Sequence, residues 1–145
     1  MTAVRSILIV EDDPRDSELM RASLDELGLA NELVFLRDGV EAMDHLMACE
    51  KAPESEHLLP ALILLDVKMP RMSGIEVLEW LQANPRLSRI PVVMLSSSKE
   101  SADLNRCYDL GVNAYVVKPV KFAEFVGAVK EVGAFWAVLN ELPPA

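Results

Sequence analysis

The chain has 145 residues, 51% of them hydrophobic and 26% charged, which is typical of one soluble globular domain. A formal net charge of −9 argues against nonspecific nucleic-acid binding, which needs clustered Lys and Arg. Its apolar runs are too short to span a bilayer and none resembles a signal peptide, so we expect a cytoplasmic protein without a membrane partner.

The first 36 residues predict a strand, a helix and a weaker strand. Residues 7–10 form an apolar run without polar alternation, as in strands buried on both faces of a parallel sheet. Asp13 then suits a helix N-cap, with Pro14 at the first helical position, and Gly28 ends the helix. Residues 32–36 are the weaker strand.

The middle of the chain repeats this pattern. A second helix should bury Val40, Met43 and Met47, and a polar, acidic surface loop should follow over residues 49–60. Residues 62–65 predict a strand. The third helix has an apolar face of Ile75, Leu78 and Leu81.

The remaining elements are two strands and two helices. Residues 92–95 and 114–117 are the strands, and Gly111 ends the helix between them. The apolar positions of that helix are Leu104, Cys107 and Tyr108, and those of the last helix are Phe122, Phe125, Val126, Val129 and Trp136.

Strict alternation of five strands and five helices predicts an α/β fold: a doubly wound parallel sheet with helices on both faces. Right-handed crossovers leave few topologies, and the flavodoxin-like strand order 2-1-3-4-5 is the natural choice. We expect one domain over residues 1–139 and a C-terminal arm over residues 140–145, where two prolines prevent a helix.

Chemically useful side chains follow four of the strands. Glu11 and Asp12 follow the first strand and Asp66 follows the third. Ser96 follows the fourth and Lys118 the fifth. Ligands in such folds bind beyond the carboxyl ends of the strands, so these groups should meet at one edge. Clustered carboxylates need a counter-charge, and Mg²⁺ together with the lysine would supply it.

Each of these residues also has a simpler interpretation. An aspartate after a strand is often only a helix N-cap, and we assign that role to Asp13. Ser96 alone could be a loop serine, and Lys118 alone a solvated lysine. Their joint occurrence in this order favours a functional site.

Four segments resemble the receiver domain of two-component response regulators. They are Val10-Glu-Asp-Asp13, Leu65-Asp-Val-Lys-Met-Pro70 with Ser73-Gly74, Pro91-Val-Val-Met-Leu-Ser96, and Tyr115-Val-Val-Lys-Pro119. The resemblance implies a phosphoacceptor at Asp66 and Mg²⁺ held by Asp12, by Glu11 through water, by Asp66 and by the backbone carbonyl of Lys68.

The resemblance also implies the remaining roles. Lys118 would pair with the phosphoryl oxygens, Ser96 would be the switch hydroxyl, and Tyr115 the aromatic residue whose rotamer follows it. The Lys118-Pro119 step resembles one that is commonly a cis peptide in the family. The donor would be a sensor histidine kinase, and the receiver would catalyse only its own phosphorylation and dephosphorylation.

A narrower resemblance concerns the end of the chain. Phe135-Trp136 and Asn140-Glu-Leu-Pro143-Pro144 resemble the single-domain regulators paired with bacterial and cyanobacterial phytochromes. That subgroup implies a phytochrome-type kinase partner and a homodimer formed through the C-terminal arm. Since no DNA-binding domain follows the fifth helix, we expect signalling by protein contact or onward phosphotransfer.

Three other classes are less consistent with the sequence. A flavodoxin-like redox protein would need a hydroxyl- and glycine-rich phosphate loop where Glu11-Asp-Asp-Pro14 stands. A Mg²⁺ phosphatase of the aspartate type usually places its nucleophile after the first strand, whereas Asp66 follows the third. A degenerate receiver acting only as a binding module would not need the intact set of site residues.

Overall fold

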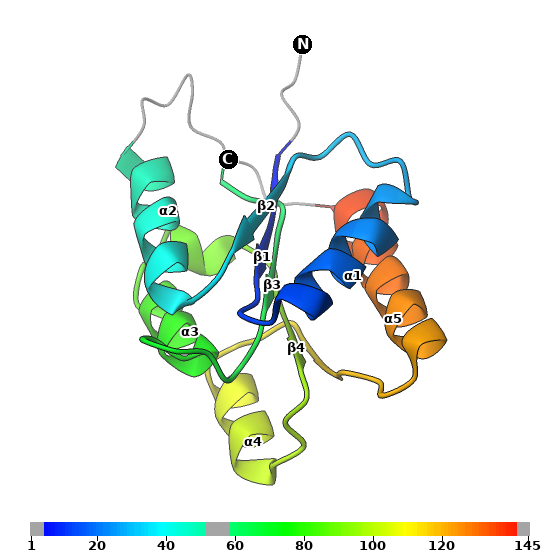
Figure 1. Ribbon diagram of the computed structural model, residues 1–145. Helices are drawn as coiled ribbons and strands as arrows, with labels where there is room; N and C mark the ends of the chain where they lie inside the picture. The colour runs from blue at the N-terminus through cyan, green and yellow to red at the C-terminus, as the bar shows by residue number, and fades with distance from the viewer. Residues whose placement is uncertain (1–4, 52–58, 142–145) are drawn as a thin grey trace.

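A parallel sheet of five strands forms the centre of the computed structural model, which describes residues 5–51 and 59–141 (Figure 1). The strand order is β2-β1-β3-β4-β5, as the sequence predicts. The strands are β1 (Ile7–Val10), β2 (Leu33–Leu36), β3 (Leu62–Leu65), β4 (Val92–Ser96) and β5 (Ala114–Val117).

Helices cover both faces of the sheet. In Figure 1, α1 (Pro14–Asp25) and α5 (Phe122–Ala134) lie together on one face. The opposite face is covered by α2 (Gly39–Lys51), α3 (Gly74–Gln82) and α4 (Ser101–Asp109). A short 3₁₀ turn, η1 (Leu87–Arg89), precedes β4, and a π-helical turn, η2 (Phe135–Leu139), continues α5.

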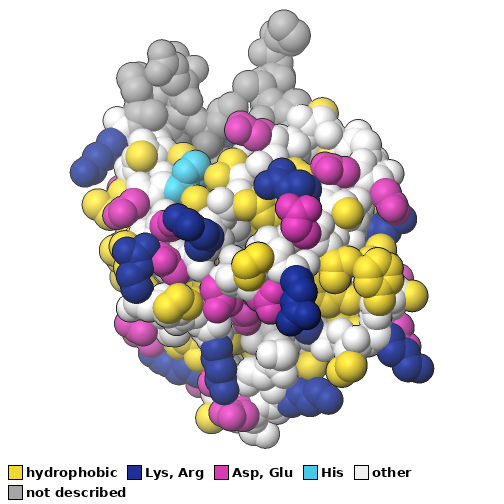
Figure 2. All heavy atoms as spheres, viewed as in Figure 1, with side chains coloured by type: hydrophobic (Ala, Val, Ile, Leu, Met, Phe, Trp, Pro, Cys, Tyr) yellow, Lys and Arg dark blue, Asp and Glu magenta, His cyan; other side chains and the backbone are white. Residues whose placement is uncertain are grey.

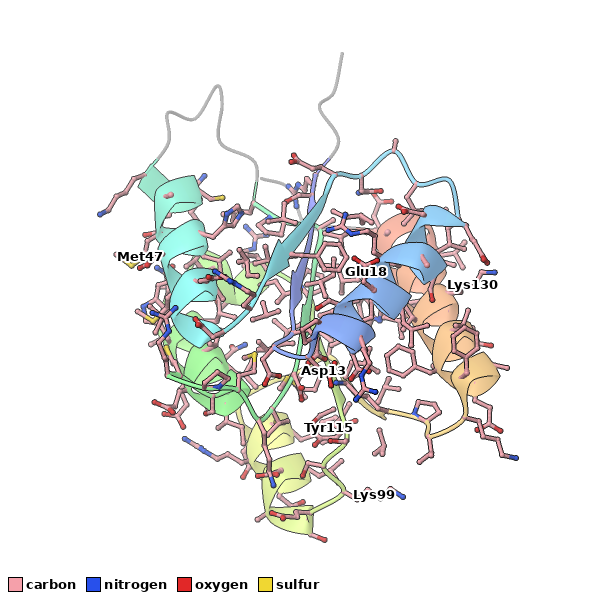
Figure 3. The ribbon with its side chains drawn as sticks, viewed as in Figure 1. Asp13, Glu18, Met47, Lys99, Tyr115 and Lys130 are labelled. Carbon is pink, nitrogen blue, oxygen red and sulfur yellow. The ribbon has the colours of Figure 1, made fainter. Side chains whose placement is uncertain are left out.

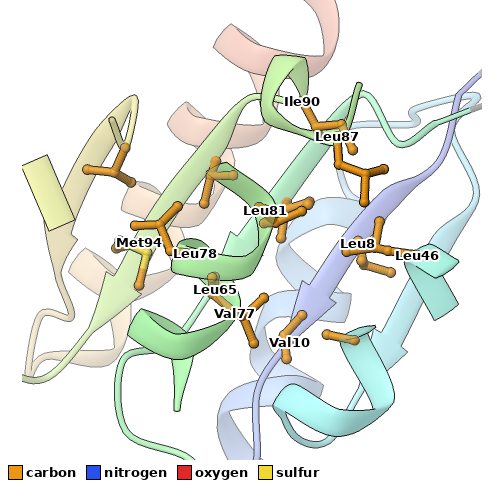
Figure 4. Close-up of a cluster of buried hydrophobic side chains, with 14 of the residues drawn as sticks. Leu8, Val10, Leu46, Leu65, Val77, Leu78, Leu81, Leu87, Ile90 and Met94 are labelled. Carbon is orange, nitrogen blue, oxygen red and sulfur yellow. The ribbon is translucent and has the colours of Figure 1, made fainter. Parts of the chain in front are cut away.

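Alternating side chains of the inner strands build two separate cores. Leu8 and Val10 of β1 point into the cluster shared with α2 and α3, which Figure 4 shows in close-up. Ile7 and Ile9 point to the other face, where Met20 and Leu24 of α1 meet Phe125 and Val129 of α5. This two-residue period explains why the apolar runs show no polar alternation: both faces are buried.

The predicted buried face of α2 was wrong. Ala42 and Leu46 are its fully buried side chains, whereas Met47 is exposed and points away from the sheet in Figure 3. The helix carries two apolar stripes about one residue apart, and packing against α3 selects the one with the smaller side chains. The helix also runs to Lys51, so residues 49–51 are not part of a loop.

Two aromatic residues assigned to helix cores are largely exposed. Tyr108 is 54% exposed on α4, and Phe122 is 68% exposed at the start of α5. Cys107, Phe125 and Val129 occupy the core positions on these helices, as predicted. In residues 5–51 and 59–141, no helix is both long and apolar enough to cross a membrane.

Candidate functional site

Backbone hydrogen bonds at the strand ends bring the predicted site residues together. Asp66 donates its N–H to the Val10 carbonyl at 3.2 Å, which places it beside Glu11. Lys118 donates its N–H to the Ser96 carbonyl at 2.8 Å. The parallel register thus gathers four strand ends at one edge of the sheet.

Three carboxylates form an acidic cluster at this edge. One oxygen from each of Glu11, Asp12 and Asp66 lies within 4.8 Å of the other two. Glu11 and Asp66 are buried, and Asp12 is exposed. Figure 2 shows acidic side chains gathered in the lower centre of the view, near the strand ends of Figure 1. An all-oxygen set with one ligand open to solvent suits a hard divalent cation that keeps several waters.

Lys118 supplies the positive charge beside this cluster. Its ammonium donates to Glu11 Oε1, to Asp16 Oδ2 at 2.9 Å and to Asp66 Oδ2 at 3.3 Å, and its side chain is only 9% exposed. Burial by itself lowers the pKa of Lys118, but the hydrogen bonds to Glu11 and Asp16 outweigh burial and hold it above its usual range. Lys118 therefore carries its positive charge beside the Asp66 carboxylate at neutral pH.

The surroundings of Glu11 raise the pKa of its carboxyl group strongly. Its pKa is raised to about 8: burial and the nearby Asp66 charge raise it, and they outweigh the hydrogen bond from Lys118, which lowers it. Burial and Asp66 therefore favour the protonated form of Glu11, whereas Lys118 favours the charged form.

Asp13 has the structural role that we predicted for it. Its carboxylate accepts the backbone N–H groups of Arg15 at 2.8 Å and Asp16 at 3.3 Å, and it caps α1 with Pro14 in the first turn. These two hydrogen bonds lower the pKa of the Asp13 carboxyl. Asp13 is thus occupied by the helix and is not part of the acidic cluster.

Ser96 and Tyr115 are connected through the backbone of Ser98. The Ser98 N–H donates to Ser96 Oγ at 3.3 Å, and the Tyr115 hydroxyl donates to the Ser98 carbonyl at 2.9 Å. The Ser98 hydroxyl also donates to Asp103 of α4 at 2.6 Å. A movement of Ser96 would therefore disturb the hydrogen bonds that Ser98 makes with Tyr115 and with Asp103 of α4.

The β3–α3 loop is held against the site by close packing. A Cβ on Gly74 would overlap the carbonyl oxygen of Asp66, so α3 can begin here only at a glycine. Lys68, in the same loop, is exposed and pairs with Glu100 at 3.6 Å. The Lys118–Pro119 bond is trans, which corrects the cis geometry that the resemblance suggested; the two isomers of an X-Pro bond differ little in energy.

Two contacts at the site were not predicted from the sequence. The first is the hydrogen bond from Lys118 to Asp16. An acidic residue in the first turn of a helix ordinarily serves only to stabilise the helix through its dipole, so this contact was not expected. Arg71, at φ 65°, donates twice to the buried carboxylate of Asp38, through Nε at 2.8 Å and a terminal nitrogen at 2.6 Å. No spacing rule links residues 33 positions apart, so only the fold reveals the second pair.

The residues proposed for the dimer contact stand at the C-terminal end of the sequence, distant in sequence from the acidic cluster. Trp136 packs partly buried against the core between α1 and α5, and its ring meets Phe135 edge-on with centroids 5.0 Å apart. Phe135 is 49% exposed, and Asn140 follows the last helical turn. Pro143 and Pro144 lie outside the described residues.

A family model supports the resemblance seen in the motifs. The response regulator receiver domain model matches residues 7–130, which include every candidate site residue outside the arm. This match covers most of the chain.

Relatives and solved structures agree with the family model. Response regulator Rcp1 of Synechocystis sp. is 38% identical over 139 residues, which cover 96% of this chain and 93% of Rcp1. Its Mn²⁺-bound structure has a TM-score of 0.87, 36% identity and coverage of 97% and 99% of the two chains. The phosphorylated cyanobacterial phytochrome response regulator RcpA has a TM-score of 0.88, 37% identity and coverage of 98% and 100%. The bacteriophytochrome response regulator AtBRR has a TM-score of 0.70, 49% identity and coverage of 97% and 100%.

Proposed function

The chain belongs to the response regulator receiver family, and we propose that it accepts a phosphoryl group from a sensor histidine kinase onto Asp66 in a Mg²⁺-dependent reaction. One observation carries the proposal. The buried Asp66 carboxylate lies beside the Glu11 and Asp12 carboxylates, and the Lys118 ammonium contacts it at 3.3 Å. This arrangement offers a nucleophile next to both a cation site and a fixed positive charge.

Each site residue has its own role in the proposed phosphoryl transfer. An Asp66 oxygen attacks the phosphorus, and the bond from phosphorus to the kinase histidine breaks, with the electron pair leaving on the imidazole. Lys118 offsets negative charge on the transferred phosphoryl group. Mg²⁺, held by Asp12, Asp66 and the Lys68 carbonyl and by Glu11 through water, would neutralise further charge when bound.

Support for a divalent cation comes from the donor set and from a relative. The acidic cluster provides only oxygen ligands, and Rcp1 has a Mn²⁺-bound form. Hard cations such as Mg²⁺ and Mn²⁺ accept the same carboxylate ligands. Magnesium is our proposal because it binds through few protein carboxylates and would take phosphoryl oxygens and water as its other ligands.

The phosphoryl group would act on the contacts around Ser98. If the Ser96 hydroxyl turned to the phosphoryl group, it would leave the Ser98 N–H that it now accepts at 3.3 Å. Ser98 also holds Tyr115 and Asp103, so the surface formed by α4 and β5 would change. We propose this population shift as the output signal, read by a protein partner.

A phytochrome-type kinase is our proposed donor, because similar proteins include the cyanobacterial phytochrome response regulator RcpA and the bacteriophytochrome response regulator AtBRR. A phosphotransfer profile against the purified, phosphorylated sensor kinases of the source organism tests it. We expect the phytochrome-type kinase to transfer its phosphoryl group at least about tenfold faster than non-cognate kinases, since interface complementarity governs encounter and orientation. A faster transfer from a kinase of another type would contradict the assignment.

We also propose a homodimer through the C-terminal end of α5 and η2. Phe135, Val138 and Leu139 are 49%, 63% and 74% exposed, an unusual share of apolar surface for one short turn. A two-fold pair would bury this surface on both copies.

Replacing both Val138 and Leu139 by serine should shift the protein towards monomer by at least about tenfold in dissociation constant, because two apolar anchors are lost from each copy. Multi-angle light scattering after size exclusion measures this at several concentrations. Trp136 is a poor choice for the test because it packs on its own core. Val120→Ser is the matched control, since Val120 is 98% exposed outside the proposed interface. A monomeric parent, or an equal shift in the control, would count against the dimer.

A further inference from the structure

Asp16 is a charged residue at the site to which the proposed chemistry gives no role. It lies in the first turn of α1, and its Oδ2 accepts from Lys118 Nζ at 2.9 Å. That distance is shorter than the 3.3 Å between Lys118 and the Asp66 carboxylate. Its side chain is 28% exposed, so the contact lies at the rim of the site.

The three partners of Lys118 match the capacity of its ammonium group. An ammonium carries three N–H donors, and the three acceptors are carboxylates on three different segments. Glu11 follows β1, Asp16 belongs to α1 and Asp66 follows β3. With all three directions occupied, the orientation of the ammonium is fixed.

Asp16 and Glu11 differ in what else they do. Glu11 belongs to the acidic cluster and also accepts the Asp13 N–H at 3.1 Å. The Asp16 carboxylate accepts a hydrogen bond from Lys118 and from no other group among the described residues. Asp16 therefore can hold Lys118 whatever Glu11 binds.

We propose that Asp16 is a positioning residue for phosphoryl transfer. Its carboxylate holds one N–H of Lys118 so that another remains directed at Asp66, where the phosphoryl oxygens arrive. The inference rests on the proposed function of Asp66. A purely structural role, stabilising α1 through the helix dipole, would affect folding and leave the rate of transfer unchanged.

Three variants of the full chain separate these roles. Asp16→Ala removes the acceptor oxygen and the charge, whereas Asp16→Asn keeps an oxygen that can accept from Lys118. Glu18→Ala is the matched control, because Glu18 is an exposed acid on the same helix and its loss changes the net charge equally (Figure 3). The measured quantity is the rate constant for phosphorylation by acetyl phosphate with Mg²⁺.

We expect Asp16→Ala to react about tenfold more slowly, the lower end of what the loss of one hydrogen bond to a charged group implies. Asp16→Asn and Glu18→Ala should stay within about twofold of the parent. In metal-free protein, ¹⁵N NMR should show the slowly exchanging Lys118 ammonium signal in the parent and in Asp16→Asn, and its loss in Asp16→Ala.

The outcomes can be told apart. A parent chain that acetyl phosphate never labels overturns the proposed function itself. A parent that is labelled, with Asp16→Ala equally fast, overturns the positioning role alone. Equal slowing in Asp16→Ala and Asp16→Asn also overturns it, because charge and not the acceptor oxygen would then be responsible.

Discussion

Asp66→Asn should lose the labile acyl phosphate when the protein is incubated with Mg²⁺ and a phosphodonor. The amide has nearly the same shape, but it lacks the charged oxygen that attacks the phosphorus. We expect the labelling rate to fall by at least about 1000-fold, the scale seen when a nucleophile is removed. Intact-mass spectrometry and phosphate-affinity electrophoresis both measure the adduct.

Asp13→Asn is the matched control for this experiment. Asp13 stands at the same edge of the sheet, but its carboxylate caps α1, and asparagine caps a helix about as well as aspartate does. This variant should be labelled at nearly the parental rate. Normal labelling of Asp66→Asn would show that another residue accepts the phosphoryl group.

The metal-free protein should become less stable as pH rises from about 5 to 8, and Glu11 should cause part of that loss. The pKa of Glu11 is about 8 in the folded chain against an ordinary value of 4.5. A carboxyl group whose pKa is higher in the folded than in the unfolded state stabilises the protein. This stabilisation is fully present below the unfolded-state pKa and is lost as pH rises through the folded-state pKa. The slope in this window is at most about 1.4 kcal/mol per pH unit for one proton.

Urea unfolding in EDTA at several pH values measures this effect, with Glu11→Gln as the matched control. Glutamine cannot titrate, so the variant should lack the Glu11 part of the slope. Mg²⁺ should stabilise the parent more strongly at higher pH, because metal ligation requires the deprotonated carboxylate. Lys118 keeps its charge across this window because its pKa is raised. Parallel curves for parent and Glu11→Gln would contradict the raised pKa.

Regular elements were predictable because local patterns reflect burial. Every strand was placed from its apolar run, and Asp13-Pro14 marked the start of α1. The helix ends at Asp25, three residues before the predicted Gly28, which lies in the following turn at φ 62°, a conformation that glycine reaches without a Cβ penalty. The buried face of a helix did not always follow from its local pattern. The helix α2 has two apolar stripes, and only its neighbours decide that Leu46 and not Met47 is buried.

The site was predictable to the extent that it follows the strand ends. Parallel strands bring their carboxyl ends to one edge, so the sequence alone placed Glu11, Asp12, Asp66, Ser96 and Lys118 together. Those positions depend on strand order, which the alternation of elements restricts to very few topologies.

Only the tertiary structure decided which side chains contact one another at that edge. Asp16 reaches Lys118 because α1 packs beside α5, and Arg71 reaches Asp38 because the β3–α3 loop crosses the start of α2. Such contacts join residues 102 and 33 positions apart, and no local period encodes them. Their geometry is set by the packing of whole helices against the sheet, which depends on the complete set of core side chains and not on any one motif.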